Sequence, residues 1–294
     1  MIRIKKKYRV LCAVLAAVVL AVGVGVFLSH GEWWYPLKLA LHSYPAPDLI
    51  ETIPAGEMRH WTLDELLALE NVTESNNLLL VNASYPLPDG YEVVLTEYNG
   101  AKMHPLMVDP YVALRDAVQA KTGVRIYVAS DYRTAEEQAA IIGDSEEGIA
   151  ASLGCSEHEA GLALDVYAPY YAGKEFLGSR AGRMVNDICG DYGYIIRYPR
   201  NKTDVTGIAY EPWHLRYVGQ PHAEIIMESG IALEEYVALL RVGVWYSHGE
   251  YLISRRTADD LRLPEGWARC EISPDNTGNY IVTLKMNEYN VKYT

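Results

Sequence analysis

Helix patterns and strand patterns occur side by side in this 294-residue sequence, so a mixed fold of α and β elements is expected. The segments Thr62–Glu65 and Thr134–Glu137 both match the capping box, in which a Thr and a Glu three residues later satisfy the first backbone amides of a helix. Residues 162–166 alternate as a strand does, with Asp165 on the face opposite the leucines. Because 50% of the residues are apolar, these elements can pack around a sizeable core.

The N-terminal end is predicted to be a membrane anchor. Residues 1–9 contain five Lys and Arg residues, and the nineteen residues 10–28 contain no charged residue. A helix of that length spans roughly the ~30 Å of hydrocarbon in a bilayer. The basic residues place 1–9 in the cytoplasm as a tail and everything after the transmembrane segment 10–28 outside. Because residues 26–30 make a poor signal-peptidase site, an uncleaved anchor is favoured over secretion after signal cleavage.

Composition limits the remaining functions. After the five basic residues of the tail, 21 Lys and Arg residues face 38 Asp and Glu residues, which argues against nucleic-acid binding. Outside the apolar segment the cysteines are Cys155, Cys189 and Cys270, so at most one intramolecular disulfide can form among them. The sequence leaves that pairing open.

The rest of the chain divides into a linker, a main domain and a small appendage. Residues 29–60 are rich in Pro and have no sustained period, which predicts a stalk or a strap lying on the domain. The main domain is expected over residues 61–243. From residue 244 the pattern changes to short strands and turns, which predicts a β-rich appendage over 244–294.

Within the main domain the helix and strand patterns follow one another in order. A helix is predicted from Asp109 to Gly123, because Asp109 is a suitable N-cap and Pro110 suits the first helical position. The other predicted elements are a short helix from Thr62, a buried strand over 78–81, a strand over 124–129, a helix from Thr134 that reaches residue 153 alone or with a successor, a strand around Asp165, a helix over 180–188, a strand over 193–198, and helices over 222–228 and 233–240.

A candidate metal site lies in the segment from Ser156 to Val166, which reads S-E-H-E-A-G-L-A-L-D-V. The Asp165 carboxylate within an apolar strand needs a partner, and a cation can be that partner. His158 in the same segment and His214 in the segment E-P-W-H supply two imidazoles. Two His and one Asp with an open fourth position is the ligand set of a catalytic zinc site. Glu211 is then a spare carboxylate that can take the proton of the attacking water.

Together, the segments S-x-H-x-x-G-x-A-x-D and E-x-W-H resemble the VanY-type zinc D-alanyl-D-alanine carboxypeptidases of the LAS metallopeptidase family, which trim the stem peptides of the bacterial cell wall. The resemblance spans about residues 75–240 and includes the pair Tyr132-Arg133. It implies an α+β fold in which a small, mainly antiparallel sheet with flanking helices carries the zinc. One departure is Asp131, which stands where such enzymes commonly have Gly.

The resemblance also implies roles for individual residues. Arg133 is suited to substrate binding because its guanidinium presents paired donors to a carboxylate or carbonyl oxygen. The implied roles are zinc ligation by His158, Asp165 and His214, proton transfer by Glu211, substrate binding and oxyanion stabilisation by Arg133, and contact with the C-terminal end of the peptide by Gln138 and Ser156.

The expected function is therefore that of a membrane-anchored, extracytoplasmic zinc D,D-carboxypeptidase that removes the terminal D-Ala from peptidoglycan stem peptides or their precursors. An L,D-carboxypeptidase or a D,D-dipeptidase of the same fold is the alternative within the enzyme class. An inactive cell-wall-binding module is the alternative from another class. The oligomeric state, the role of residues 244–294 and the choice between antibiotic resistance and wall remodelling are left open.

Overall fold

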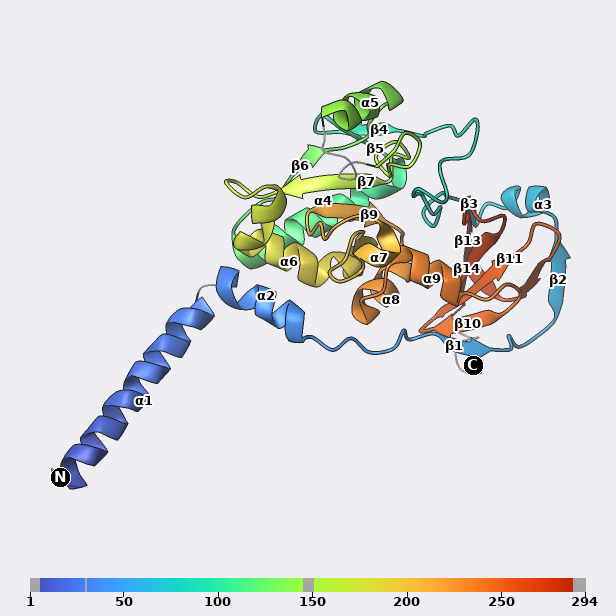
Figure 1. The fold of residues 1–294 in the computed structure, drawn as a ribbon. Coiled ribbons are helices and arrows are strands. Elements are labelled where there is room, and N and C mark those ends of the chain that lie inside the picture. Colours follow the sequence, from blue (N-terminus) through green and yellow to red (C-terminus); the bar gives the residue numbers. More distant parts are fainter. Residues whose placement is uncertain (1–5, 30, 145–150, 288–294) are drawn as a thin grey trace.

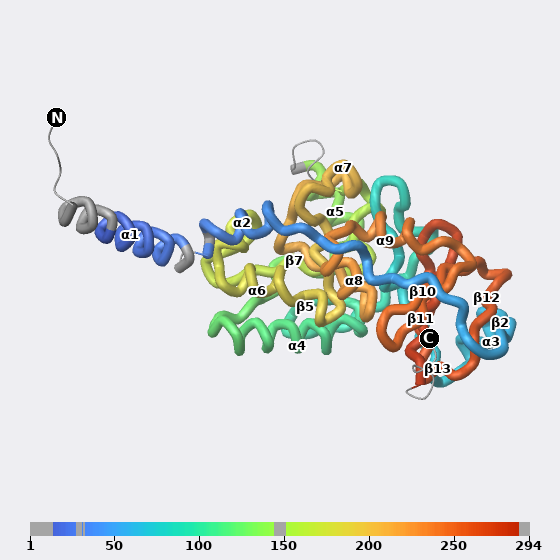
Figure 2. The backbone as a smooth tube through the Cα atoms, turned by 90° about the horizontal axis from the view of Figure 1, so that it is seen from below, coloured from blue at the N-terminus to red at the C-terminus, as the bar shows by residue number. Residues whose placement is uncertain are grey.

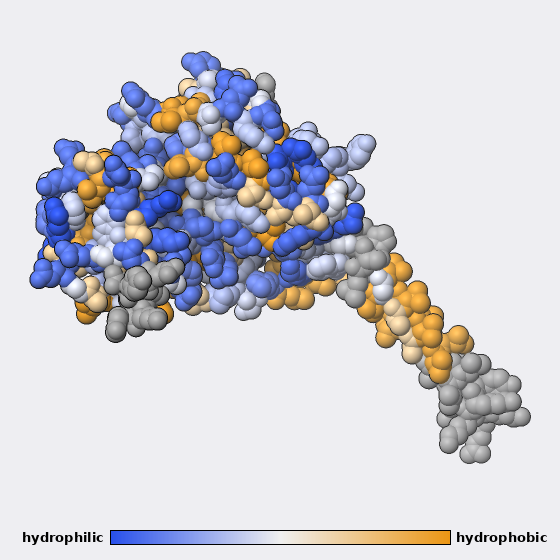
Figure 3. Space-filling view, turned by 180° about the vertical axis from the view of Figure 1, so that it is seen from behind, coloured by the Kyte–Doolittle hydropathy of each residue, from blue (hydrophilic) through white to orange (hydrophobic). Residues whose placement is uncertain are grey.

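The computed structural model describes residues 6–29, 31–144 and 151–287, and shows a body from which one helix projects (Figure 1). The projecting helix is α1 (Lys6–Ser29), and its described apolar side chains, from Val14 to Phe27, are exposed (Figure 3). No helix in the described part of the chain is both long and apolar enough to span a membrane. The transmembrane anchor predicted over residues 10–28 is therefore not confirmed.

A four-stranded antiparallel sheet forms the centre of the body, as the α+β expectation requires. Leu164 and Val166 point to a buried face, where they pack with Leu114 and Val118 of a long helix. Figure 1 shows α4 and α6 on one side of this sheet and α5 on the other. In spatial order, the strands are β6 (Tyr127–Ser130), β7 (Ala163–Tyr167), β9 (His214–Tyr217) and β8 (Tyr194–Ile196).

The long helix α4 (Pro105–Thr122) begins five residues earlier than the sequence predicted. His104, not Asp109, is its N-cap, and the imidazole Nδ1 accepts a hydrogen bond from the backbone of Leu106 at 3.3 Å. Pro110 lies inside the helix, still near its first turns. The predicted start was wrong because Pro105 and Pro110 both suit the first turn of a helix, and the helix begins at the earlier one. The predicted end at Gly123 is confirmed, with a φ of 72°.

Residues 78–81 are buried as predicted but do not form a strand. Side chains from distant parts of the chain hold their backbone instead of a neighbouring strand. Arg216 donates to the carbonyl of Leu79 at 2.8 Å, and Asn276 donates to the carbonyl of Leu80 at 2.9 Å. Buried carbonyl groups need such partners, and here side chains supply them.

The other predicted helices appear in the predicted order, with small shifts at their ends, and a four-residue helix over 203–206 was not predicted. Thr134 and Glu137 form the predicted capping box, with both backbone-to-side-chain bonds present. The proposed continuation of that helix to residue 153 crosses 145–150, which lie outside the described residues, and 151–153 are not helical. The helices are α3 (Leu63–Leu67), α5 (Ala135–Asp144), α6 (Arg180–Ile188), α7 (Thr203–Thr206), α8 (His222–Ser229) and α9 (Leu233–Leu239), and β4 (Thr96–Tyr98) pairs with β5 (Ala101–Met103).

The C-terminal β unit is larger than the predicted appendage, because strands from the N-terminal part of the chain complete it. Residues 50–52 pair with one of its strands, and residues 72–74 run parallel to another. The boundaries drawn at residues 60 and 243 therefore do not separate it from the rest. Its six-stranded sheet has the order β1 (Ile50–Thr52), β10 (Trp245–His248), β11 (Tyr251–Arg256), β14 (Tyr280–Met286), β13 (Trp267–Pro274) and β3 (Val72–Glu74), and β2 (Met58–Trp61) pairs with β12 (Leu261–Pro264).

The segment before β1 lies on the body as a strap, which is one of the two forms expected for it (Figure 2). It begins with the helix α2 (Gly31–Leu41) and continues as an extended chain to β1. Tyr35 in α2 is 1% exposed, and its hydroxyl donates to Asp187 at 2.9 Å. Lys38 pairs with the same carboxylate at 2.7 Å. Burial of an aromatic ring and two polar contacts hold α2 against α6.

Candidate active site

Three predicted metal ligands meet at the central sheet. Asp165 on β7 and His214 at the start of β9 are register partners in the antiparallel pair. His158 comes from the loop before β7. One ligand atom from each of the three side chains lies within 4.8 Å of the others. The Asp165 carboxylate is 3.4 Å from His158 Nε2 through Oδ2 and 3.0 Å from His214 Nδ1 through Oδ1.

The outer nitrogen of each histidine faces a protein oxygen. His158 Nδ1 lies 2.7 Å from the carbonyl of Asp131, so this nitrogen donates and Nε2 keeps its lone pair for a metal. His214 Nε2 lies 3.6 Å from Glu157 Oε2, and Nδ1 faces the centre. Asp165 Oδ1 is buried and makes no hydrogen bond within the described structure. One nitrogen from each histidine and the carboxylate of Asp165, whose Oδ1 has no hydrogen-bond partner, fit the ligand set of a zinc ion.

The electrostatics of the site also favour a cation. Burial lowers the pKa of His214, but contacts with Asp165 and Glu157 outweigh it and raise the value to about 9. Burial would raise the pKa of Asp165, and the two histidines instead hold it well below its usual range. The carboxylates thus stabilise a positive charge at this position, and a divalent cation supplies one.

Glu157 was missed as a functional residue by the sequence analysis. It is fully buried, and Oε1 accepts from Arg197 Nε at 2.6 Å and Arg216 Nη1 at 2.7 Å. Burial tends to raise its pKa, but the two arginines hold it far below the usual range. Its other oxygen faces His214. The sequence offered one signal for this role. Arg197 and Arg216 each stand in an apolar strand pattern, and a charged residue there needs a buried partner.

Glu211 lies beside the metal ligands on a tight turn. Its backbone carbonyl accepts from the amide of His214 at 3.2 Å, and its Oε2 is 3.8 Å from His214 Nδ1. Burial raises its pKa; His214 opposes the shift and Asp165 adds to it. A carboxylate with a raised pKa is a better proton acceptor near neutral pH than an exposed one.

Arg133, Gln138 and Ser156 line the same cavity, which has a volume of about 170 Å³. The guanidinium of Arg133 donates to Gln138 Oε1 at 2.6 Å and to Ser130 Oγ at 3.0 Å. No carboxylate forms an ion pair with Arg133 among the described residues, so its charge is available to a substrate. Ser156 is 4% exposed. The structure thus brings all the predicted site residues to one cavity.

Asp131, which the sequence analysis marked as a departure, and Cys155, which adjoins Ser156, do not obstruct this arrangement. The carboxylate of Asp131 accepts from the backbone amide of Lys102 at 2.5 Å and does not pair with Arg133. Cys155 is a free, partly exposed thiol, and Cys189 and Cys270 are free and buried. The candidate ligand group in the described residues therefore contains histidine and aspartate but no cysteine.

Comparisons with known proteins agree with the geometry. Residues 100–220 match the family model described as VanY: D-alanyl-D-alanine carboxypeptidase. A D-alanyl-D-alanine carboxypeptidase of Enterococcus faecium is 32% identical over 251 residues, which are 76% of this chain and 79% of that protein.

Solved structures with the same fold include two that carry ligands. The D,D-dipeptidase VanXYg, in complex with a D-Ala-D-Ala phosphinate analogue, matches with a TM-score of 0.61 and 30% identity, over 71% of this chain and 93% of its own. A mutant of the D,D-pentapeptidase VanY from a VanB-type resistance cassette, in complex with Zn(II), matches with a TM-score of 0.50 and 36% identity, over 55% of this chain and 98% of its own.

Proposed function

The chain belongs to the VanY family of D-alanyl-D-alanine carboxypeptidases, and from that premise we propose that it is a zinc metallopeptidase that removes the terminal D-Ala from peptidoglycan stem peptides. The observation that carries the proposal is the position of Glu211 beside a two-histidine, one-aspartate ligand set, in one cavity with Arg133. A binding module has no physical need for this combination. The inactive cell-wall-binding alternative is therefore disfavoured.

The residues of the cavity divide the reaction between them. Zinc held by the ligand set supplies a Lewis acid that activates water near neutral pH. Glu211 accepts the proton of the attacking water and returns it to the leaving amine. Arg133 binds an oxygen of the substrate, and its two hydrogen bonds to Gln138 and Ser130 fix the plane of its guanidinium.

Product analysis tests this function. The full chain is incubated with a muropeptide pentapeptide, with and without a metal chelator, and the products are identified by mass. We expect loss of one D-Ala, abolition by the chelator and recovery on addition of zinc. If the zinc-loaded chain binds the pentapeptide but releases nothing from it or from shorter peptides, the enzyme assignment is wrong.

A D,D-dipeptidase is a second candidate, because the structural relative with a TM-score of 0.61 is a D,D-dipeptidase. The dipeptide D-Ala-D-Ala and a tetrapeptide are therefore included beside the pentapeptide. Preferential cleavage of the dipeptide would favour the dipeptidase, and cleavage of the tetrapeptide alone would favour an L,D-carboxypeptidase. The three activities use the same zinc chemistry and differ in the side chains that line the substrate pocket.

We also propose that the enzyme acts outside the cytoplasm, held by its N-terminal segment. The support is the uncharged run of residues 10–28, the basic residues before it, and the exposed apolar side chains along α1. Membrane fractionation and protease treatment of intact cells test this. The body should remain with the membrane after a high-salt wash and be cut by external protease, whereas a body found free in the cytoplasm contradicts the anchor.

A further inference from the structure

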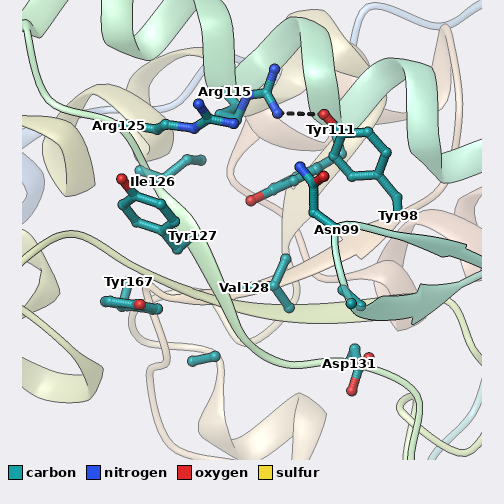
Figure 4. A pocket seen from close by; sticks show the side chains of 13 residues that line it. Tyr98, Asn99, Tyr111, Arg115, Arg125, Ile126, Tyr127, Val128, Asp131 and Tyr167 are labelled. Atoms are coloured by element: carbon teal, nitrogen blue, oxygen red, sulfur yellow. Dashed lines mark hydrogen bonds between the residues drawn. The ribbon is translucent and has the colours of Figure 1, made fainter.

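A second cavity, with a volume of about 300 Å³, lies apart from the active site (Figure 4). Its walls come from α4, the turn between β4 and β5, the edge strand β6 and Tyr167. None of its lining residues also lines the cavity that contains the metal ligands. Any ligand held here is therefore held by side chains that the proposed peptidase reaction does not use.

Arg115 and Arg125 lie at one end of this cavity, and they differ in their hydrogen-bond and ion-pair partners (Figure 4). Arg115 is 8% exposed; it pairs with Asp116 at 2.7 Å and donates to the hydroxyl of Tyr98 at 2.6 Å. Arg125 has no ion pair with any described residue, and its Nε is buried without an acceptor. A buried donor without a partner is costly, so an acceptor placed at this Nε, which no described residue supplies, would stabilise the half-buried Arg125.

Tyr111 offers a second unpaired donor. Its side chain is 3% exposed, yet its hydroxyl makes no hydrogen bond within the described part of the chain, and Figure 4 shows the ring directed into the cavity. Burial raises the pKa of this hydroxyl to about 12 although Arg115 and Arg125 act to lower it. The group is therefore a protonated donor at neutral pH, close to both guanidinium groups.

The carboxylates near the cavity do not cancel the charge of Arg125. Asp116 is engaged by Arg115. Asp131 lies at the end away from the arginines in Figure 4, and its carboxylate accepts from the backbone of Lys102. On a chain with a formal net charge of −12, this end of the cavity is a local positive site.

We propose that this cavity is a second ligand site, which binds a small organic anion through a carboxylate or phosphate group held between Arg125 and Tyr111. An arginine fork suits either group. The cavity, of about 300 Å³, has room beside the anionic group for a body of roughly the size of one sugar. That body packs against the tyrosines, of which Tyr127 and Tyr167 have ring centroids 5.6 Å apart.

Three probes of similar size test the proposal on the zinc-loaded full chain. They are N-acetylmuramic acid with a carboxylate, N-acetylglucosamine 1-phosphate with a phosphate, and neutral N-acetylglucosamine. Titration calorimetry should detect binding of at least one anionic probe, at least ten times tighter than that of the neutral sugar. Binding of only one anion identifies the group that is recognised. Equal affinity for the neutral sugar, or no binding of either anion, overturns the proposal.

Variants locate the site. Arg125→Met should weaken binding of the anionic probe at least tenfold, and Tyr111→Phe, which removes only the hydroxyl, should weaken it several-fold. The matched control is Arg180→Met, because Arg180 is an exposed arginine that lines neither cavity. Release of D-Ala should be unchanged in all three variants, which verifies folding. If binding survives Arg125→Met and Tyr111→Phe, the anion lies elsewhere and the proposal fails, while the proposed peptidase function is unaffected.

Discussion

Glu157 lies directly behind His214, with Oε2 3.6 Å from the imidazole Nε2. The carboxylate is held in that place by two fully buried arginines, Arg197 and Arg216. Partners of this kind fix the orientation of a metal-ligating imidazole and raise its basicity. The position of the carboxylate behind His214 therefore depends on a buried ion network between Arg197, one residue after β8, and Arg216 on β9.

The first prediction concerns this network. Glu157→Gln keeps the shape of the side chain but removes the charge that faces His214 and the two arginines. We expect zinc affinity to fall by about 10- to 100-fold. We also expect a loss of stability on the order of 3–5 kcal/mol, because the buried Arg216 loses its carboxylate partner and Arg197 loses one of its two. Metal titration with a competing chelator and denaturant unfolding measure the two effects.

A matched control separates the two effects. Glu234 forms the other ion pair of Arg197, at 2.6 Å, and lies on α9 away from the metal ligands. Glu234→Gln should lower stability and leave zinc affinity near that of the unchanged protein. If both variants lose zinc to the same degree, Glu157 has only a structural role.

The second prediction concerns Glu211 as the proton acceptor. Glu211→Gln should lower kcat for D-Ala release by roughly 10²–10⁴-fold, because general acid–base catalysis contributes about that much. Zinc content should remain normal, since Glu211 is outside the ligand set. Steady-state kinetics and metal analysis of the same preparation provide the check. Normal turnover in a zinc-loaded Glu211→Gln protein would assign the proton transfer to another group.

The pH dependence of the reaction follows from the environment of the same carboxylate. Burial raises the pKa of Glu211 above the ordinary glutamate value of 4.5, and only the ionised form can accept a proton. Activity should therefore fall as the pH drops through this raised pKa, so that the acidic limb of kcat/KM lies above pH 4.5. A pH–rate profile taken with saturating zinc measures it. An acidic limb at or below that value would show that the charge of the bound zinc outweighs the effect of burial on Glu211.

The third prediction concerns the substrate contact of Arg133. Arg133→Lys keeps the positive charge but loses the planar pair of donors that Gln138 and Ser130 hold in place. We expect kcat/KM to fall by about 10- to 100-fold, which corresponds to roughly 1.4–2.8 kcal/mol. A pentapeptide with an amidated C-terminus serves as the control. If Arg133 binds the terminal carboxylate, the unchanged enzyme should discriminate against the amide and Arg133→Lys should do so much less.

The metal ligands could be predicted from the sequence because their chemistry is encoded locally. His158 and Asp165 lie seven residues apart, and Glu211 and His214 lie on one turn, so residue type and spacing suffice. Glu157 adjoins His158 in the chain, yet its role depends on arginines 40 and 59 residues away. Each arginine within an apolar strand pattern indicates a buried partner, but that the shared partner is Glu157 is decided only when β8 and β9 pair.

The errors in the fold have the same origin. The apolar run 78–81 has the composition of a strand, but its carbonyls are bonded by side chains more than a hundred residues away. The strands β1, β2 and β3 join the C-terminal unit across most of the chain length. Their short sequences carry too little periodicity to predict a partner at that distance. Local signals such as the capping boxes were reliable because both partners lie within four residues.

The last prediction concerns stability and the buried His222. Its Nδ1 lies 2.6 Å from the hydroxyl of Tyr236, and its Nε2 lies 2.8 Å from Oγ1 of Thr283 on β14. Burial, with a smaller contribution from His248, lowers its pKa to about 3, from 6.5 in a model peptide. Between those values the unfolded chain binds a proton that the folded chain does not bind. Stability is therefore lost as the pH falls through this range, by up to about 1.4 kcal/mol per pH unit from this group.

His222→Gln removes the titrating group. It should lower stability at neutral pH, because a hydrogen bond between α8 and β14 is lost, and it should flatten the dependence of the unfolding free energy between pH 6.5 and pH 4. Denaturant unfolding at several pH values measures the slope, and His60→Gln, at an exposed histidine, is the matched control. The control should keep the full slope. If His222→Gln keeps it as well, the acid sensitivity of the fold comes from other groups, and the buried imidazole only bridges the helix and the sheet.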